Sequence, residues 1–151
     1  MPGFLRLDRI EGEANATGHE GDIEFDSLGY GIGAPGSGEG AVSFDQILLT
    51  KRVDRASMRL LEAASCGTVL PSARLDIATV WGDVLVVYLS IELEGARVSR
   101  VSATWKGGLP IEQIWLTFER ITWTYQRATP DGGDRASFSH DLRGAASVQP
   151  N

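Results

Sequence analysis

The feature that most constrains the fold is an apolar–polar alternation that changes phase within a single run. In residues 22–32, Ile23 and Phe25 share one face, whereas Leu28, Tyr30 and Ile32 share the other. Because side chains on a strand alternate with period two, such a switch requires a bulge or a strand that changes its packing partner. Residues 42–51 and 111–125 switch phase in the same way. The pattern favours a closed or nearly closed antiparallel barrel.

The remaining segments fit this architecture. Alternation predicts further strands at 4–8, 73–81, 84–93, 97–105 and 136–143, with Gly82 and Asp83 forming a two-residue hairpin turn. Apolar residues at helical spacing predict one helix within 54–66, ended by Gly67. We therefore predict a mainly β fold, an antiparallel β-barrel with one short α-helix. Residues 1–151 form a single domain, and 144–151 are expected to be a disordered tail.

Charge and composition exclude several function classes. The chain carries 20 acidic and 14 basic residues, a net charge of −6, and no basic stripe of the kind that nucleic-acid binding requires. Its longest mainly apolar run, 84–93, is far shorter than the ~20 residues needed to span a bilayer. The first residues contain no sustained apolar segment typical of a secretory signal, so we expect synthesis in the cytoplasm. No nucleic-acid partner and no membrane insertion are predicted.

No motif rises to a catalytic, cofactor or metal site. Residues 31–36 match G-x-G-x-x-G, but they lead into a strand and not into the helix that binds a pyrophosphate. His19 and His140 each adjoin an acid within a polar segment, which favours surface histidines over metal ligands. Glu92 and Glu94 alternate with apolar residues, as on the solvated face of a half-buried strand. We predict no catalytic residue, no cofactor, no metal and no enzymatic activity.

Cysteine and tryptophan receive structural interpretations. Cys66 is the only cysteine, which excludes an internal disulfide, and we interpret it as a buried or half-buried structural thiol. Trp123 continues an apolar series and is expected in the core. Trp81 and Trp115 are expected to be partly exposed, where aromatic residues often mark subunit contacts.

The order of several degenerate segments resembles a known family. The chain contains Gly12-Glu13 and then Tyr30-Gly31, followed by VSFDQI at 42–47 and LTKRVD at 49–54. Further on it contains AASCG at 63–67, LPSARL at 70–75 and LTFERITWTY at 116–125. Over about residues 3–143 this order resembles the Hcp (haemolysin-coregulated protein) family, the tube proteins of bacterial type VI secretion systems.

The resemblance implies a fold similar to that of phage tail-tube proteins, with six subunits in a ring and rings stacked into a hollow tube. It also implies a contractile sheath that expels the tube beneath a spike protein, and small effector proteins carried in the ring lumen. Export from the bacterial cytoplasm, out of the cell or into target cells, without a signal peptide is implied as well.

Two groups of residues receive roles from this reading. After the phase switch, Leu28, Tyr30 and Ile32 are expected to enter the barrel, which leaves a strip of small residues facing the lumen: Ser27, Gly29 and Gly31. The glycine-rich loop 33–41 resembles the extended loop with which family members reach an adjacent ring or subunit. That loop comprises Gly33, Ala34, Pro35, Gly36, Ser37, Gly38, Glu39, Gly40 and Ala41.

Departures and alternatives accompany the resemblance. The loop at 106–108 is shorter than the glycine-rich hairpin of many family members, and glycines at 29 and 31 replace bulkier or hydroxyl residues, so effector contacts do not transfer. The alternatives are a tail-tube subunit of a phage-like contractile particle and, from a different class, a monomeric β-barrel that binds a ligand through Trp81, Trp105 or Trp115. A barrel enzyme using His19, His140 or the Glu92/Glu94 pair is the remaining alternative.

Overall fold

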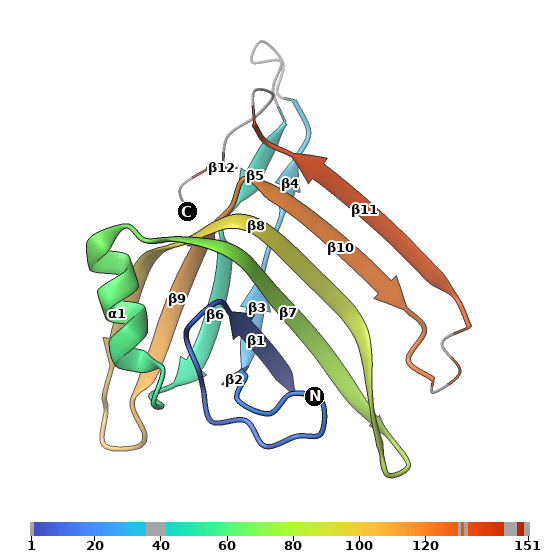
Figure 1. The fold of residues 1–151 in the computed structure, drawn as a ribbon, viewed down its shortest axis with the longest axis horizontal. Coiled ribbons are helices and arrows are strands. Elements are labelled where there is room, and N and C mark those ends of the chain that lie inside the picture. Colours follow the sequence, from blue (N-terminus) through green and yellow to red (C-terminus); the bar gives the residue numbers. More distant parts are fainter. Residues whose placement is uncertain (1, 36–41, 130, 132, 144–147, 150–151) are drawn as a thin grey trace.

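The computed structural model describes residues 2–35, 42–129, 131, 133–143 and 148–149. In these residues the chain forms strands and a single helix (Figure 1). Their bounds are β1 (Gly3–Leu7), β2 (Ile23–Phe25), β3 (Ser27–Gly29), β4 (Ile32–Gly33), β5 (Ser43–Asp45), β6 (Ile47–Arg52), α1 (Ser57–Cys66), β7 (Val69–Trp81), β8 (Val84–Thr104), β9 (Ile111–Thr117), β10 (Arg120–Gln126), β11 (Arg135–Asp141) and β12 (Val148–Gln149). The prediction of a mainly β fold with one short helix is confirmed.

The main sheet is antiparallel and wraps around one core. Its strands follow the order β2-β1-β7-β8-β9-β6-β3, and β10 adds to the first half of β8 with β11 outside it. The ends of this path, β2 and β3, are joined by the single residue Asp26, whose N–H donates to the Thr50 carbonyl at 2.6 Å. No ladder joins β2 to β3 in the described residues. The sheet therefore returns on itself through the chain and not through a hydrogen-bonded barrel closure.

The phase switches mark changes of strand partner, as predicted. On either side of Asp26, β2 pairs with β1 and β3 pairs with β6. The predicted strand 111–125 divides at Phe118–Glu119. Its first part, β9, lies between β6 and the second half of β8, and its second part, β10, lies between the first half of β8 and β11. Each break lets one run of residues serve two parts of the sheet.

Other element boundaries differ from the prediction. The runs 84–93 and 97–105 form one continuous strand, β8, which passes through Gly95 at φ 62° and shifts register between Val98 and Arg100. A left-handed residue is tolerated within this strand because glycine has no Cβ. Residues 42–51 form two strands, with β5 in a separate small sheet between β4 and β12. Within 144–151, the structure describes Val148–Gln149, which pair in parallel with β5.

The core fills the interior of this sheet and the space beneath α1. Leu60 and Ala63 bury one face of α1, and Gly67 ends the helix in the left-handed conformation at φ 63°. The largest fully buried side chains come from most strands of the main sheet, from β5 and from α1: Phe44, Lys51, Leu5, Ile23, Ile47, Leu49, Leu60, Leu75, Ile91, Leu93, Ile114 and Leu116. Lys51 is the charged exception. Among the described residues, no helix is long and apolar enough to cross a membrane.

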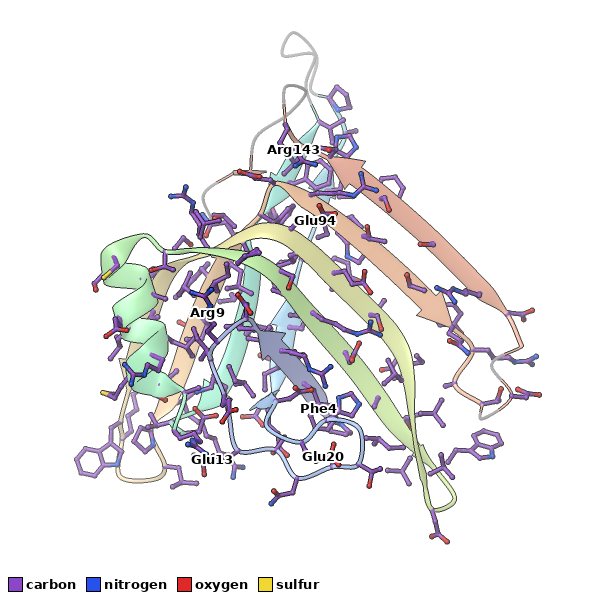
Figure 2. All side chains as sticks on the ribbon, viewed as in Figure 1. Phe4, Arg9, Glu13, Glu20, Glu94 and Arg143 are labelled. Carbon is purple, nitrogen blue, oxygen red and sulfur yellow. The ribbon has the colours of Figure 1, made fainter. Side chains whose placement is uncertain are left out.

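The loop before β2 folds back over the outer face of β1. Its backbone is held by the N–H of Gly12 donating to Gly21 O and that of Ala14 donating to Asp22 O. A small second core of Phe4, Ala14 and Ala78 forms beneath it. Figure 2 shows this loop, with Glu13 and Glu20 labelled, running beside Phe4.

Candidate assembly surfaces

The outward face of the long sheet forms a continuous polar wall. We define the polar wall as the polar outward-facing side chains of β1, β7, the first half of β8, β10 and β11; the outward-facing Phe4 and Ala78 belong instead to the second core beneath the loop before β2. The strand registers place Arg74, Glu92, Thr122 and Ser139 in one row across it. Arg74 and Glu92 form an ion pair at 3.0 Å, and the Thr122 and Ser139 hydroxyls are hydrogen-bonded at 2.8 Å. The side chains of this wall therefore satisfy one another within the sheet.

Further ion pairs and hydrogen bonds extend the wall in both directions. The Ser90 hydroxyl donates to the buried Asp76 at 2.7 Å, and the guanidinium of Arg74 reaches the same carboxylate at 3.0 Å. Towards the other end, Arg120 pairs with Glu94 at 3.2 Å. Glu94 and Arg143 mark this end of the sheet in Figure 2.

The last two strands project from the rest of the sheet as a ribbon, which we call the wing (β10 and β11). β11 pairs with β10 alone among the described strands, and its first five residues are exposed (Figure 1). Its outer edge is therefore a row of unpaired backbone N–H and C=O groups, the feature through which sheets recruit another strand or chain.

The inner face of the wing is apolar. Trp123 stacks on Phe138 with ring centroids 5.7 Å apart, and Tyr30 approaches Trp123 at 5.8 Å. These rings, together with Ile32, Leu89 and Tyr125, line an open cavity of about 470 Å³ that we call the wing groove. Tyr30 and Ile32 are each 47% exposed. The expectation that both enter the barrel is therefore wrong, while Leu28 does pack against the core.

Two buried polar atoms at the foot of the wing lack a hydrogen-bond partner. They are Nε1 of Trp123 and Nε2 of His140, and both rings pack near Phe44. An unpaired buried polar atom costs about 1–3 kcal/mol. In the described residues, the buried side-chain N and O atoms without a hydrogen-bond partner therefore lie in the wing.

The strip assigned to the lumen lies on a different outer face. Ser27 and Gly29 are exposed on β3, which borders β6. Gly31 is half-buried, and a Cβ there would come within 2.5 Å of the Asp45 carboxylate. In the glycine-rich loop, Gly33 pairs with Ser43. Ala34 and Pro35 are exposed, whereas residues 36–41 lie outside the described residues.

The two histidines occupy separate structural sites. His19 is buried, which corrects the expectation of a surface residue. The loop before β2 stacks its ring on Phe4 at a centroid distance of 4.2 Å and places Nδ1 3.1 Å from Asp22. His140 lies in β11 and packs against Phe44 at 4.8 Å. In the described part of the chain, no group of three or more His, Cys, Asp or Glu side chains is arranged to hold a metal ion.

The other sequence candidates are also placed. Glu92 and Glu94 are ion-paired on the polar wall, as the alternation indicated. Cys66 is exposed at the end of α1, so the interpretation as a buried thiol is wrong, because the buried face of α1 ends one turn earlier at Ala63. Trp105 and Trp81 are exposed, and Trp115 lies beneath the Arg100 guanidinium at 5.3 Å.

Comparisons with known proteins agree with this geometry. Residues 4–125 match the family described as "Type VI secretion system effector, Hcp". Protein hcp1 of Pseudomonas aeruginosa is 33% identical over 93 residues, which are 60% of this chain and 57% of that protein. The structure titled "Structure of a type six secretion system protein" has a TM-score of 0.84 at 25% identity and covers 95% of this chain and 97% of its own. Hcp1 from E. coli EAEC 042 has a TM-score of 0.77 at 29% identity, covering 92% and 99%.

The fold and these similarities first define a class: a structural component of a secretion system and not an enzyme. More particularly, the chain belongs to the Hcp family of type VI secretion system proteins. The sequence resemblance and the expectation of a non-enzymatic protein are thereby confirmed. The match to the Pseudomonas relative spans little more than half of that protein's length.

Proposed function

We propose that the chain is the ring-forming subunit of a type VI secretion inner tube. Six copies close into a ring, the rings stack into a hollow tube, and contraction of a surrounding sheath expels the tube beneath a spike protein. Small effectors travel in the ring lumen, and the protein itself leaves the bacterial cytoplasm for the exterior or the target cell. Family membership and the similarity to type VI secretion structures over almost the whole chain support this proposal.

The single structural observation that carries the proposal is the wing. It combines an exposed strand edge with an exposed apolar groove, and both features are costly for a protein that remains alone in water. A monomeric ligand-binding barrel has no use for a free strand edge. In a ring subunit, by contrast, a neighbour can pair with or cover such an edge.

The oligomeric state tests this function directly. We expect light scattering on a sizing column to give the mass of six subunits, and negative-stain images of that peak to show rings with a central hole. A monomer at every accessible concentration would refute the tube function and favour the ligand-binding alternative. In that case, ligands should change the fluorescence of the exposed tryptophans, Trp81 and Trp105.

The lumen assignment of Ser27, Gly29 and Gly31 is part of the proposal. It is supported by the exposure of Ser27 and Gly29 and by their small side chains, which would leave the channel wide. Single cysteines at Ser27 and, as a matched control on the polar wall, at Thr122 can be labelled with a bulky maleimide in a Cys66→Ser background. Slower labelling of Ser27→Cys in tubes than in monomers is expected. Protection of Thr122→Cys with Ser27→Cys still reactive would instead place the polar wall in the lumen.

The glycine-rich loop 33–41 is proposed to contact an adjacent ring or subunit. Its support is its position at a short two-strand pairing, β4 with β5, outside the main sheet. Deleting residues 36–40 should weaken ring stacking or ring closure while the melting temperature stays close to that of the parent chain. Unchanged assembly would refute this role.

A further inference from the structure

Besides the wing groove, a second apolar surface is exposed on the described part of the chain. Met58 and Leu61 project from α1, and Trp105 and Leu109 project from the β8–β9 turn. The segment that leads into α1 is joined to this turn where the Val53 N–H donates to Pro110 O at 3.2 Å. We call these four side chains the helix–turn patch. Met58 is 66% exposed and Trp105 is 70% exposed, so the patch is as unusual in water as the groove is.

The elements that carry the patch lie far from the outer strand of the wing. Figure 1 shows α1 and the β8–β9 turn at one edge of the molecule and β11 at the other. Two different surfaces of one subunit can form a heterologous contact, in which each subunit offers one surface to each neighbour. A ring made in this way covers the wing groove and the helix–turn patch in every subunit.

The chemistry of the two surfaces is complementary. The groove presents aromatic rings separated by an open cavity, and the patch presents aliphatic and aromatic side chains that can enter it. The Trp105 indole N–H already donates to Gly108 O at 2.6 Å, so this ring can be buried without leaving a polar atom unpaired.

Charge favours the same pairing. Lys106 follows Trp105 in the β8–β9 turn and makes no ion pair within the described residues. The turn that ends the wing carries two exposed carboxylates, Asp131 and Asp134, of which Asp134 lies 3.9 Å from the Arg127 guanidinium. Thr129 donates a hydrogen bond to Asp131, which lowers the pKa of that carboxyl and keeps it ionised at neutral pH. In a contact between two copies, Lys106 on one surface can therefore pair with Asp131 beside the other.

We propose that the wing groove of one subunit binds the helix–turn patch of a second copy of this chain, and that this contact closes the ring. The inference rests on the proposed function, because it assigns the surfaces through which that ring forms. The predicted contact is head-to-tail, with groove and patch contributed by different subunits at every junction.

Two single substitutions test the contact from its two sides. Phe138→Asp places a charge in the groove, and Ser139→Asp on the opposite face of the same strand is its matched control. Met58→Asp places a charge on the patch; an acidic residue in the first turn of a helix is favourable, so α1 should still form. Val84→Asp, at another exposed apolar position, is its control. We expect both test variants to shift from ring to monomer and both controls to keep the ring mass, all with parent-like circular dichroism.

Mixing the two test variants gives the decisive measurement. Phe138→Asp retains an intact patch and Met58→Asp an intact groove, so an equimolar mixture can form one good contact and should give dimers but no rings. This result also shows that both variants are folded. Absence of dimers in the mixture, or rings formed by either variant alone, would overturn the proposed contact. If Phe138→Asp fails to fold, Tyr125→Asp replaces it on the groove side.

The oligomeric state of the parent chain distinguishes failure of the tube function from failure of the groove-to-patch contact. A parent chain that forms no ring refutes the proposed function, whatever the variants do. A parent chain and variants that all form rings leave the tube function intact and refute only the groove-to-patch contact. Self-association of grooves, which would make the contact symmetric, predicts that Met58→Asp still associates alone.

Discussion

The strands that surround Lys51 and the strands of the wing differ in how completely their side chains are paired or covered within one chain. In the body of the sheet, Lys51 is fully buried, and its Nζ lies 2.6 Å from Glu112, 3.0 Å from Asp54 and 3.3 Å from the Ser57 hydroxyl. In the wing, the aromatic Phe138 is 51% exposed. The body thus pairs even a buried charge within one chain, whereas the wing leaves apolar surface uncovered. The proposed ring subunit requires this difference: a body that folds for itself and a wing available for contact with another molecule.

The largest effect should come from breaking the buried ion pair. Lys51→Met leaves the Glu112 carboxylate, 2% exposed, without its cation, and removing one partner of a buried pair costs about 3–5 kcal/mol. Urea unfolding should show this loss. The matched variant Arg59→Met removes the exposed pair with Glu62 on α1 and should change stability by less than about 0.5 kcal/mol.

The double variant Lys51→Met with Glu112→Leu sharpens this result. It removes both charges, and an apolar replacement of a buried pair is often neutral. We expect it to recover most of the lost stability. A double variant as unstable as Lys51→Met would show that the loss does not come from the Glu112 carboxylate but from the other partners of Lys51, the Asp54 carboxylate and the Ser57 hydroxyl.

Two phenylalanines compare body and wing through the same substitution. Phe44 is 1% exposed and contacts Phe118 and His140, so Phe44→Ala should cost about 3–5 kcal/mol. Phe138→Ala removes a half-exposed ring and should cost the monomer less than about 1 kcal/mol. The comparison is made by thermal unfolding under conditions where the chain is monomeric. Equal losses would contradict the division into a self-sufficient body and a dependent wing.

A smaller effect is expected where β8 passes from the wing side to the second half of the sheet. Gly95 has φ 62°, and a left-handed backbone costs a residue with a Cβ about 1–2 kcal/mol; an added Cβ would also come within 2.6 Å of Glu119 Oε2, so the exposed Glu119 side chain must move aside. Gly95→Ala should therefore lower the free energy of unfolding by that amount. Gly108→Ala is the control, because nothing lies within 4 Å of the added Cβ and its φ is not in the left-handed region. Equal effects at both positions would exclude the backbone explanation.

Strand positions and partner changes could be predicted from the sequence, whereas the packing of each face against other elements could not. Alternation located most strands, and the phase switches correctly indicated partner changes near Asp26 and Phe118. The same alternation assigned Tyr30 and Ile32 to a shared face but placed that face in the barrel, because a pattern of faces does not say what covers each face. His19 was misjudged for a related reason: a polar loop folds back and buries it against Phe4.

The candidate assembly surfaces had almost no signal in the sequence. The wing groove brings together residues from β4, β8, β10 and β11 and the segment before β4, so it exists only after the sheet has formed. The helix–turn patch joins α1 to a turn more than 40 residues later. The partial exposure of tryptophans was the one available hint, and it was confirmed for Trp81 and Trp115.

The smallest effect concerns the C-terminal end of β11, where Asp141 is half-exposed and Arg143 is exposed. The Arg143 guanidinium and backbone N–H both donate to Asp141, at 2.7 Å and 2.9 Å, and these bonds hold the pKa of the Asp141 carboxyl well below its usual range. A depressed pKa in the folded state contributes stability above the unfolded pKa of about 3.9, and this stability is lost as the pH falls towards the folded value. Arg143→Gln should raise the pKa of Asp141, measured by carboxyl-carbon NMR. At low salt, the parent chain should melt slightly above this variant at pH 6, with the gap closing as the pH falls below 3. Because both side chains are in water, 1 M salt should also reduce the gap; a gap insensitive to pH and salt would mean that Arg143 acts through packing instead.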